Sequence, residues 1–219
     1  MSTSSVAVVT GGHSYDVPNF HQLWREVGAG MDVYIQHMDD FCSSPREVRE
    51  NYDVVAFYIM MMDGPTDEGQ PWYSGQPRTA LSQLGAPGQG IVVLHHALLA
   101  YPQWDFWSEL CGIPERKFGY YHAETVTSEL VAPDHPILRG LAPWTMIDET
   151  YTMDSAGADS EILITYDHPR SMRTIAWTRQ FRRSPVFCYE AGHDNETWPD
   201  RNFQEVLRRG VQWAAGRQD

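Results

Sequence analysis

Val6-Ala-Val-Val-Thr10 and Gly90-Ile-Val-Val-Leu94 are two short apolar stretches, and a histidine follows closely after each of them. Short runs rich in β-branched residues are typical of strands that are buried on both faces of a parallel sheet. His13 comes after the Gly11-Gly12 turn that ends the first run, and His95-His96 follows the second run directly. The sequence therefore predicts histidines at the carboxyl ends of two buried strands.

Strands and helices are expected to alternate through the first half of the chain. A helix over 19–27 and strands over 32–36 and 52–58 follow the first run, and further helices are expected over 45–50, 77–84 and 104–110. Later strands are expected over 120–130, 144–153, 161–166, 174–178 and 185–190, before a terminal helix over 201–215. This order predicts an α/β fold, a mostly parallel sheet flanked by helices with an added antiparallel portion.

Composition and charge exclude several classes of protein. A length of 219 residues with 42% hydrophobic side chains predicts a single domain over residues 1–219. The net charge of −13 argues against nucleic acid as a partner, because phosphate binding needs clustered cations. The start of the chain lacks a signal-peptide pattern, and no stretch approaches the roughly 20 apolar residues of a membrane span. We therefore expect a cytoplasmic protein with no membrane partner.

The absence of cysteine pairs and of common cofactor and catalytic motifs excludes several kinds of site. The three cysteines are an odd number without C-x-x-C spacing, which indicates neither a disulfide framework nor a thiolate zinc site. The chain contains no Walker loop, G-x-G-x-x-G, H-E-x-x-H or G-x-S-x-G motif, so no nucleotide cofactor is expected.

Ligands of open α/β sheets bind beyond the carboxyl ends of the strands, and the candidate residues lie in that layer. If the strand continues through His95 and His96, their side chains point to opposite faces of the sheet. We favour His96 as the one that reaches the pocket, because it is closer to the following turn. Glu149 is a candidate general base or metal ligand, whereas Asp148 has the alternative role of capping a turn. His193 follows the 185–190 strand within Gly192-His-Asp194.

These candidates divide into three predicted sets. The catalytic set is His96, Glu149 and His193, and the metal ligands are His13, His96 and His193, which suit a divalent ion such as zinc or manganese. The predicted substrate contacts are His13, Tyr15, Asp16, His95, Trp72 and Trp198, the aromatic ones because their rings can stack on sugar faces. The structural alternatives are a loop-capping role for His13 and simple core packing for Trp198.

Six segments occur in an order that resembles the ThuA-like family, which is associated with trehalose utilisation. They are Gly11-Gly-His-Ser-Tyr-Asp16, Val92-Val-Leu-His-His96, His135-Pro-Ile-Leu-Arg-Gly-Leu141, Asp148-Glu-Thr-Tyr151, Ala176-Trp-Thr178 and Gly192-His-Asp194, followed by Arg209-Gly-Val-Gln-Trp-Ala-Ala-Gly216. The resemblance covers nearly the whole chain. It implies a flavodoxin-like fold of the class I glutamine amidotransferase type, and a role in the breakdown of disaccharides or their 3-keto derivatives.

The amidotransferase relatives carry a cysteine nucleophile on the turn after the strand that corresponds to 90–94. Here that position holds His95-His96, and no Cys or Ser occurs between Gly90 and Trp104, so glutaminase activity is not expected. Two interpretations remain. One is a sugar-utilisation enzyme whose acid–base chemistry isomerises, eliminates or hydrolyses a small sugar substrate; the other is a non-catalytic carbohydrate-binding or interaction module. Assembly into a homo-oligomer also stays open.

Overall fold

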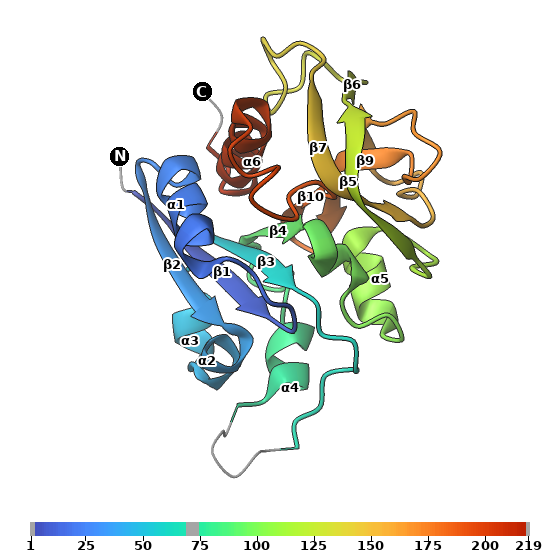
Figure 1. The fold of residues 1–219 in the computed structure, drawn as a ribbon. Helices are drawn as coiled ribbons and strands as arrows, with labels where there is room; N and C mark the ends of the chain where they lie inside the picture. Colours follow the sequence, from blue (N-terminus) through green and yellow to red (C-terminus); the bar gives the residue numbers. More distant parts are fainter. Residues whose placement is uncertain (1–2, 69–74, 218–219) are drawn as a thin grey trace.

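The computed structural model describes residues 3–68 and 75–217 and contains an eight-stranded sheet in the order β2-β1-β3-β4-β10-β9-β8-β6 (Figure 1). The parallel strands are β1 (Ser4–Gly11), β2 (Met31–His37), β3 (Val54–Ile59), β4 (Gly90–Leu94) and β10 (Ser184–Tyr189). The strands β9 (Thr174–Phe181), β8 (Glu161–Thr165) and β6 (Glu129–Leu130) extend the sheet with antiparallel pairing. The predicted mostly parallel sheet with an antiparallel addition is confirmed.

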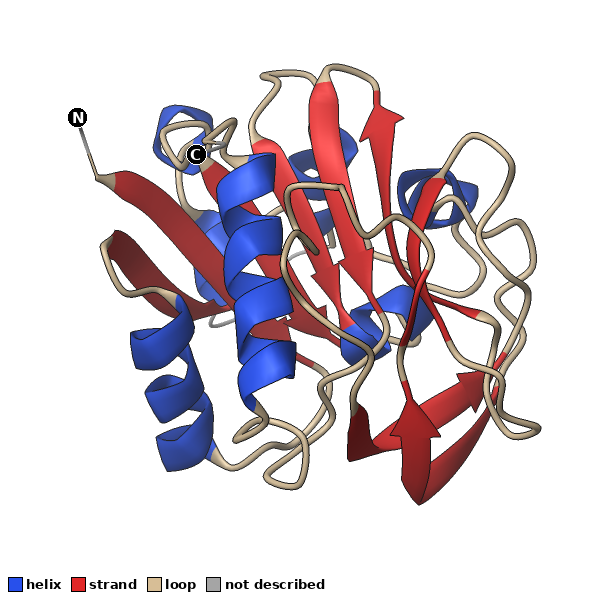
Figure 2. Ribbon diagram, turned by 90° about the horizontal axis from the view of Figure 1, so that it is seen from above, coloured by secondary structure: helices blue, strands red, loops and turns tan. Residues whose placement is uncertain are grey.

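Helices cover both faces of the parallel strands, which explains why β3 and β4 are buried along their whole length. The helices α1 (Val17–Val27) and α6 (Arg201–Ala214) pack side by side on one face, as Figures 1 and 2 show. The remaining helices are α2 (Met38–Ser43), α3 (Arg46–Arg49), α4 (Pro77–Ser82) and α5 (Asp105–Cys111). In the part of the chain that the structure describes, no helix is long and apolar enough to cross a membrane.

The strands β5 (Gly119–Thr127) and β7 (Thr145–Thr152) form a separate antiparallel ribbon beside the sheet (Figure 1). Their register shifts between Tyr121 and Glu124, and Ala123 inside this bulge has a φ of 52°. A bulge re-aims the neighbouring side chains and is common next to functional sites. The ribbon thereby brings β5 and β7 side chains toward the carboxyl end of β4.

Candidate active site

The chain turns sharply at the carboxyl end of β4. Leu94 is the last residue of the strand, and the short 3-10 helix η1 (His95–Leu99) begins immediately after it. His95 has a φ of 53°, in the left-handed region that non-glycine residues rarely adopt. Such a conformation costs on the order of 1–3 kcal/mol and persists only where the surrounding structure holds it. We had expected a turn beyond His96, whereas the structure places it at His95.

The contacts of His95 determine which ring nitrogen carries its proton. Nδ1 lies 2.5 Å from the backbone carbonyl oxygen of Glu190 and must donate to it, because a carbonyl only accepts. Nε2 then accepts from the Tyr151 hydroxyl at 2.5 Å and lies 3.6 Å from Glu149 Oε1. The ring is completely buried. His95 Nε2 therefore lies between the Tyr151 hydroxyl, from which it accepts, and the more distant Glu149 carboxylate.

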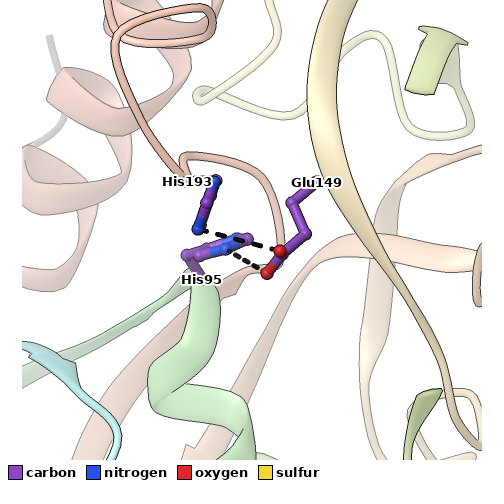
Figure 3. A group of neighbouring side chains, drawn as sticks. All are labelled: His95, Glu149 and His193. Atoms are coloured by element: carbon purple, nitrogen blue, oxygen red, sulfur yellow. Dashed lines mark ion pairs between the residues drawn. The ribbon is translucent and has the colours of Figure 1, made fainter. Parts of the chain in front are cut away.

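Glu149 is the carboxylate at which three histidines meet, two of which Figure 3 shows. Its Oε2 lies 3.7 Å from His193 Nε2 and 2.5 Å from His122 Nδ1. Burial raises the pKa of Glu149, but its interactions with His95, His193 and Tyr151 act in the opposite direction and outweigh burial, so the pKa falls to about 2. The carboxyl group is therefore ionised at neutral pH.

His193 is positioned by its own loop and by Asp148. Its Nδ1 lies 3.4 Å from Asp194 Oδ2, so Nε2 is directed to Glu149. Asp148 is buried, and it accepts from the backbone N–H groups of Gly192 at 2.8 Å and His193 at 3.1 Å. Burial and the neighbouring His95 lower the pKa of His193, which favours the neutral ring. Asp148 thus anchors the loop that carries His193.

His13 and His96 form a pair beside this cluster. Their ring centroids are 4.6 Å apart, and His13 also lies 5.8 Å from the ring of His193. His96 Nδ1 donates to the Ile59 carbonyl oxygen at 3.0 Å, while His96 Nε2 and His13 Nδ1 are buried without a hydrogen-bond partner among the described residues. Burial and the proximity of His95 hold the pKa of His96 well below its ordinary value. The pair therefore contains two buried imidazole nitrogens without a partner among the described residues.

The backbone before His13 depends on glycine. Gly12 has a φ of 75°, and a Cβ atom there would lie 2.5 Å from the Met60 carbonyl oxygen. Only a residue without a side chain allows the chain to turn this close to the end of β3. The turn brings His13 toward the histidines of β4 and the His193 loop.

The other predicted substrate residues that the structure describes make contacts within the protein. Tyr15 packs on Phe20 with ring centroids 4.8 Å apart, and Asp16 caps α1 while also accepting from Asn195 at 3.0 Å. Trp198 is 3% exposed and donates from Nε1 to the Gly192 carbonyl oxygen, as the core-packing alternative anticipated. Trp72 lies outside the described residues.

Two residues of the site were not among the predicted ones. Tyr151 lies two positions after Glu149 on β7, and the period-two alternation of a strand is the signal that places both on one face. His122 reaches Glu149 from the other strand of the ribbon, and its side chain is 63% exposed. No sequence pattern marks His122, because the contact depends on the antiparallel pairing of β5 with β7 and on the bulge.

The cysteines are remote from this chemistry. Cys42, Cys111 and Cys188 are all buried, and burial raises the pKa of Cys111 to about 12. A thiol in such surroundings is a poor nucleophile, because only the thiolate is reactive. The turn after β4 therefore presents an imidazole and not a thiol.

These features define the fold. The mostly parallel sheet, with the histidine cluster gathered at the ends of β1, β4 and β10, has the flavodoxin-like, class I glutamine amidotransferase-like fold. Residues 5–214 match the model of the ThuA family, described as trehalose utilisation, and the chain belongs to this family. No curated protein matches the sequence.

Solved structures share the fold at low sequence identity. A ThuA-like protein from Parabacteroides merdae superposes with a TM-score of 0.75 at 17% identity, covering 99% of this chain and 92% of that one. A cytoplasmic protein from Salmonella typhimurium gives a TM-score of 0.69 at 11% identity over 96% and 98% of the two chains. A glutamine amidotransferase from Methylobacillus flagellatus gives 0.54 at 11% identity over 100% and 97%.

Proposed function

We propose that the chain is a sugar-utilisation enzyme that moves a proton next to a carbonyl group of a keto derivative of a disaccharide. We further propose that a divalent ion, zinc or manganese, binds to His95, Glu149 and His193. The observation that carries this proposal is the convergence of two imidazole nitrogens and one ionised carboxylate, whose ligand atoms all lie within 4.8 Å of one another.

The surroundings of both histidines fit metal binding. Metal-ligating histidines usually donate their second ring nitrogen to a carbonyl or carboxylate oxygen. His95 does so to the Glu190 carbonyl, and His193 faces Asp194 in the same way. Ligands of a tetrahedral zinc ion lie about 3.3 Å apart. The separations of 3.6 and 3.7 Å from Glu149 to His95 and His193 therefore require only a small contraction.

The proposed metal set differs from the one that the sequence predicted. Glu149 and His95 take the places of His13 and His96, because the turn at His95 directs its ring to the carboxylate. The unpartnered nitrogens of His13 and His96 then suit a second role beside the ion, contact with a substrate hydroxyl group. This arrangement separates metal binding from substrate binding.

The residues divide the chemistry as follows. A divalent ion held by His95, Glu149 and His193 would supply a Lewis acid for the carbonyl oxygen of the keto sugar, where negative charge develops when the neighbouring C–H proton leaves. We assign the role of base to His122, whose side chain is 63% exposed and whose Nδ1 lies 2.5 Å from Glu149 Oε2, so that its other ring nitrogen accepts the proton and exchanges it with water. Protonation of the former carbonyl carbon, with transfer of the neighbouring hydroxyl proton to the carbonyl oxygen, completes an isomerisation. Loss of an oxygen substituent from the carbon on the other side of the deprotonated carbon, with a proton passing to the leaving oxygen, completes an elimination.

A cytoplasmic location and a small sugar as partner belong to the same proposal. The lack of a membrane-spanning helix among the described residues and the relative that is described as a cytoplasmic protein both support this location. The net charge of −13 disfavours nucleic acid as an alternative partner.

Elemental analysis combined with an activity assay tests the proposal. The purified protein should contain about one zinc or manganese ion per chain and should convert 3-keto trehalose or 3-keto sucrose, but not the parent disaccharides. A chelator should abolish turnover, and added metal should restore it. Protein with neither metal nor turnover would instead favour the non-catalytic carbohydrate-binding module.

Tyr120 offers a second test at the rim of the site. Its ring is 58% exposed and lies 5.2 Å from the ring of His122, whereas Tyr121 points to the other face, where Arg170 covers it. We expect Tyr120→Ala to raise KM by about tenfold through loss of sugar stacking, with little change in kcat. Tyr121→Ala is the matched control and should leave KM unchanged. Equal effects of both substitutions would argue against a stacking role.

A further inference from the structure

A positively charged hollow lies at the end of α6, in a protein that is otherwise acidic. The chain has 16 Lys and Arg against 29 Asp and Glu. Four arginines nevertheless line one hollow of about 240 Å³, whose lining is Pro136, Arg139, Arg208, Arg209, Gln212, Trp213 and Arg217. No carboxylate is part of this lining among the described residues. Bringing four like charges together is unfavourable unless an anion compensates them.

One carboxylate nearby neutralises part of this charge. Glu205 accepts from Arg208 at 2.7 Å and from Arg209 at 2.6 Å. Arg139 and Arg217 are exposed, and their guanidinium groups have no hydrogen-bond or ion-pair partner within residues 3–68 and 75–217. Two guanidinium groups therefore remain available to a ligand.

The electrostatics of the helix explain only part of the arrangement. Cations near a helix carboxyl terminus are stabilised by the helix dipole, which accounts for arginines at the end of α6. Arg139, however, comes from a separate segment of the chain, and it is held against α6 by the hydrogen bond that Arg209 donates to its carbonyl oxygen at 2.6 Å. The convergence of two segments is what a binding site for an anion requires.

We propose that this hollow binds a phosphate-type oxyanion, either free phosphate or a small phosphate monoester. The planar guanidinium group can donate two parallel hydrogen bonds to such an anion, and Arg139 and Arg217 would supply them from opposite segments. The hollow lies at the carboxyl-terminal end of α6, whereas the helix begins next to the His193 loop. The site is therefore distinct from the candidate active site and independent of the proposed function.

Isothermal titration with inorganic phosphate and with glycerol phosphate tests this site. We expect saturable binding to the wild-type protein that weakens as sodium chloride is added. The variant Arg139→Gln/Arg217→Gln should bind at least about tenfold more weakly. The control Arg46→Gln/Arg173→Gln removes the same charge from arginines that are 58% and 59% exposed elsewhere, and should bind as the wild type does. Tighter binding of glycerol phosphate than of phosphate would identify a monoester as the ligand.

Two results would overturn the proposal. One is the absence of saturable binding to the wild-type protein, and the other is an equal loss of affinity in both double variants, which would indicate a general charge effect. Circular dichroism of each variant checks that the fold is retained. If the double variant does not fold, the single Arg139→Gln substitution carries the same comparison against Arg46→Gln.

Discussion

Glu149→Gln is expected to abolish the proposed metal binding and to lower turnover by about a thousandfold or more, while the melting temperature stays within a few degrees of wild type. The amide has the shape of the carboxylate but lacks the negative charge that a divalent ion requires. Glu149 is also the group that His95, His122 and His193 share. Metal content measured by elemental analysis and kcat/KM measured on the keto disaccharide check the two effects together.

Glu124→Gln on β5 of the same ribbon is the control. Glu124 pairs with His168 and Arg170 outside the Glu149 cluster, so its substitution should change neither metal content nor turnover. If Glu149→Gln kept its metal but lost turnover, Glu149 would act as a base and not as a ligand. If it kept both, the proposed site would be wrong.

The two adjacent histidines give a sharper comparison within the same experiment. His95→Ala should lose the metal, because His95 Nε2 faces Glu149, and the left-handed backbone at this position should stay strained because alanine also carries a Cβ atom. His96→Ala should keep the metal and still lose turnover, because the unpartnered His96 Nε2 is proposed to contact the substrate and not the ion. If His96→Ala lost the metal and His95→Ala kept it, the result would favour the ligand set that the sequence predicted.

The fold could be predicted well wherever burial alone determines the pattern. The strand over 90–94 was predicted with its observed bounds, because an apolar run between glycine and histidine has no competing interpretation. The helix α2 was not predicted, since it begins directly where β2 ends and no turn residue separates them. The ribbon of β5 and β7 was expected as strands, but its separation from the main sheet depends on long-range pairing that local sequence does not encode.

The site was harder to predict than the fold, for reasons of geometry. Histidines at strand ends could be placed in one layer from the order of the elements, and His13, His96 and His193 do lie in contact. The choice between His95 and His96 required the φ of 53° at His95, because two adjacent histidines do not reveal which of them adopts the left-handed conformation. His122 required knowledge of which strand pairs with β7. Backbone strain and long-range register are the two properties that the sequence alone did not reveal.

Asp148 connects the stability of the fold to the geometry of the site. Its Oδ1 accepts from Glu149 N at 2.9 Å, His193 N at 3.1 Å and the Thr197 hydroxyl at 2.7 Å, and its Oδ2 accepts from Gly192 N at 2.8 Å. Burial raises the pKa of this carboxyl, although the hydrogen bonds from Thr197, His193 and Gly192 act in the opposite direction. The same side chain thus holds both β7 and the loop that carries His193.

Asp148→Ala should lower the free energy of unfolding by about 3 kcal/mol or more, because it leaves several buried N–H donors unpaired at about 1–3 kcal/mol each. Asp148→Asn should lower the free energy of unfolding by less than Asp148→Ala does. The amide oxygen of asparagine still accepts hydrogen bonds in place of one carboxylate oxygen, whereas its NH₂ group faces N–H donors in place of the other. Urea denaturation measures the free energy of unfolding of both variants. The control is Asp154→Ala, because Asp154 is exposed just after β7, and its stability should stay within about 0.5 kcal/mol of wild type. Because the His193 loop loses its anchor, Asp148→Ala should also weaken metal binding. A loss of stability below about 1 kcal/mol would show that Trp198 and the rest of the loop hold His193 without Asp148.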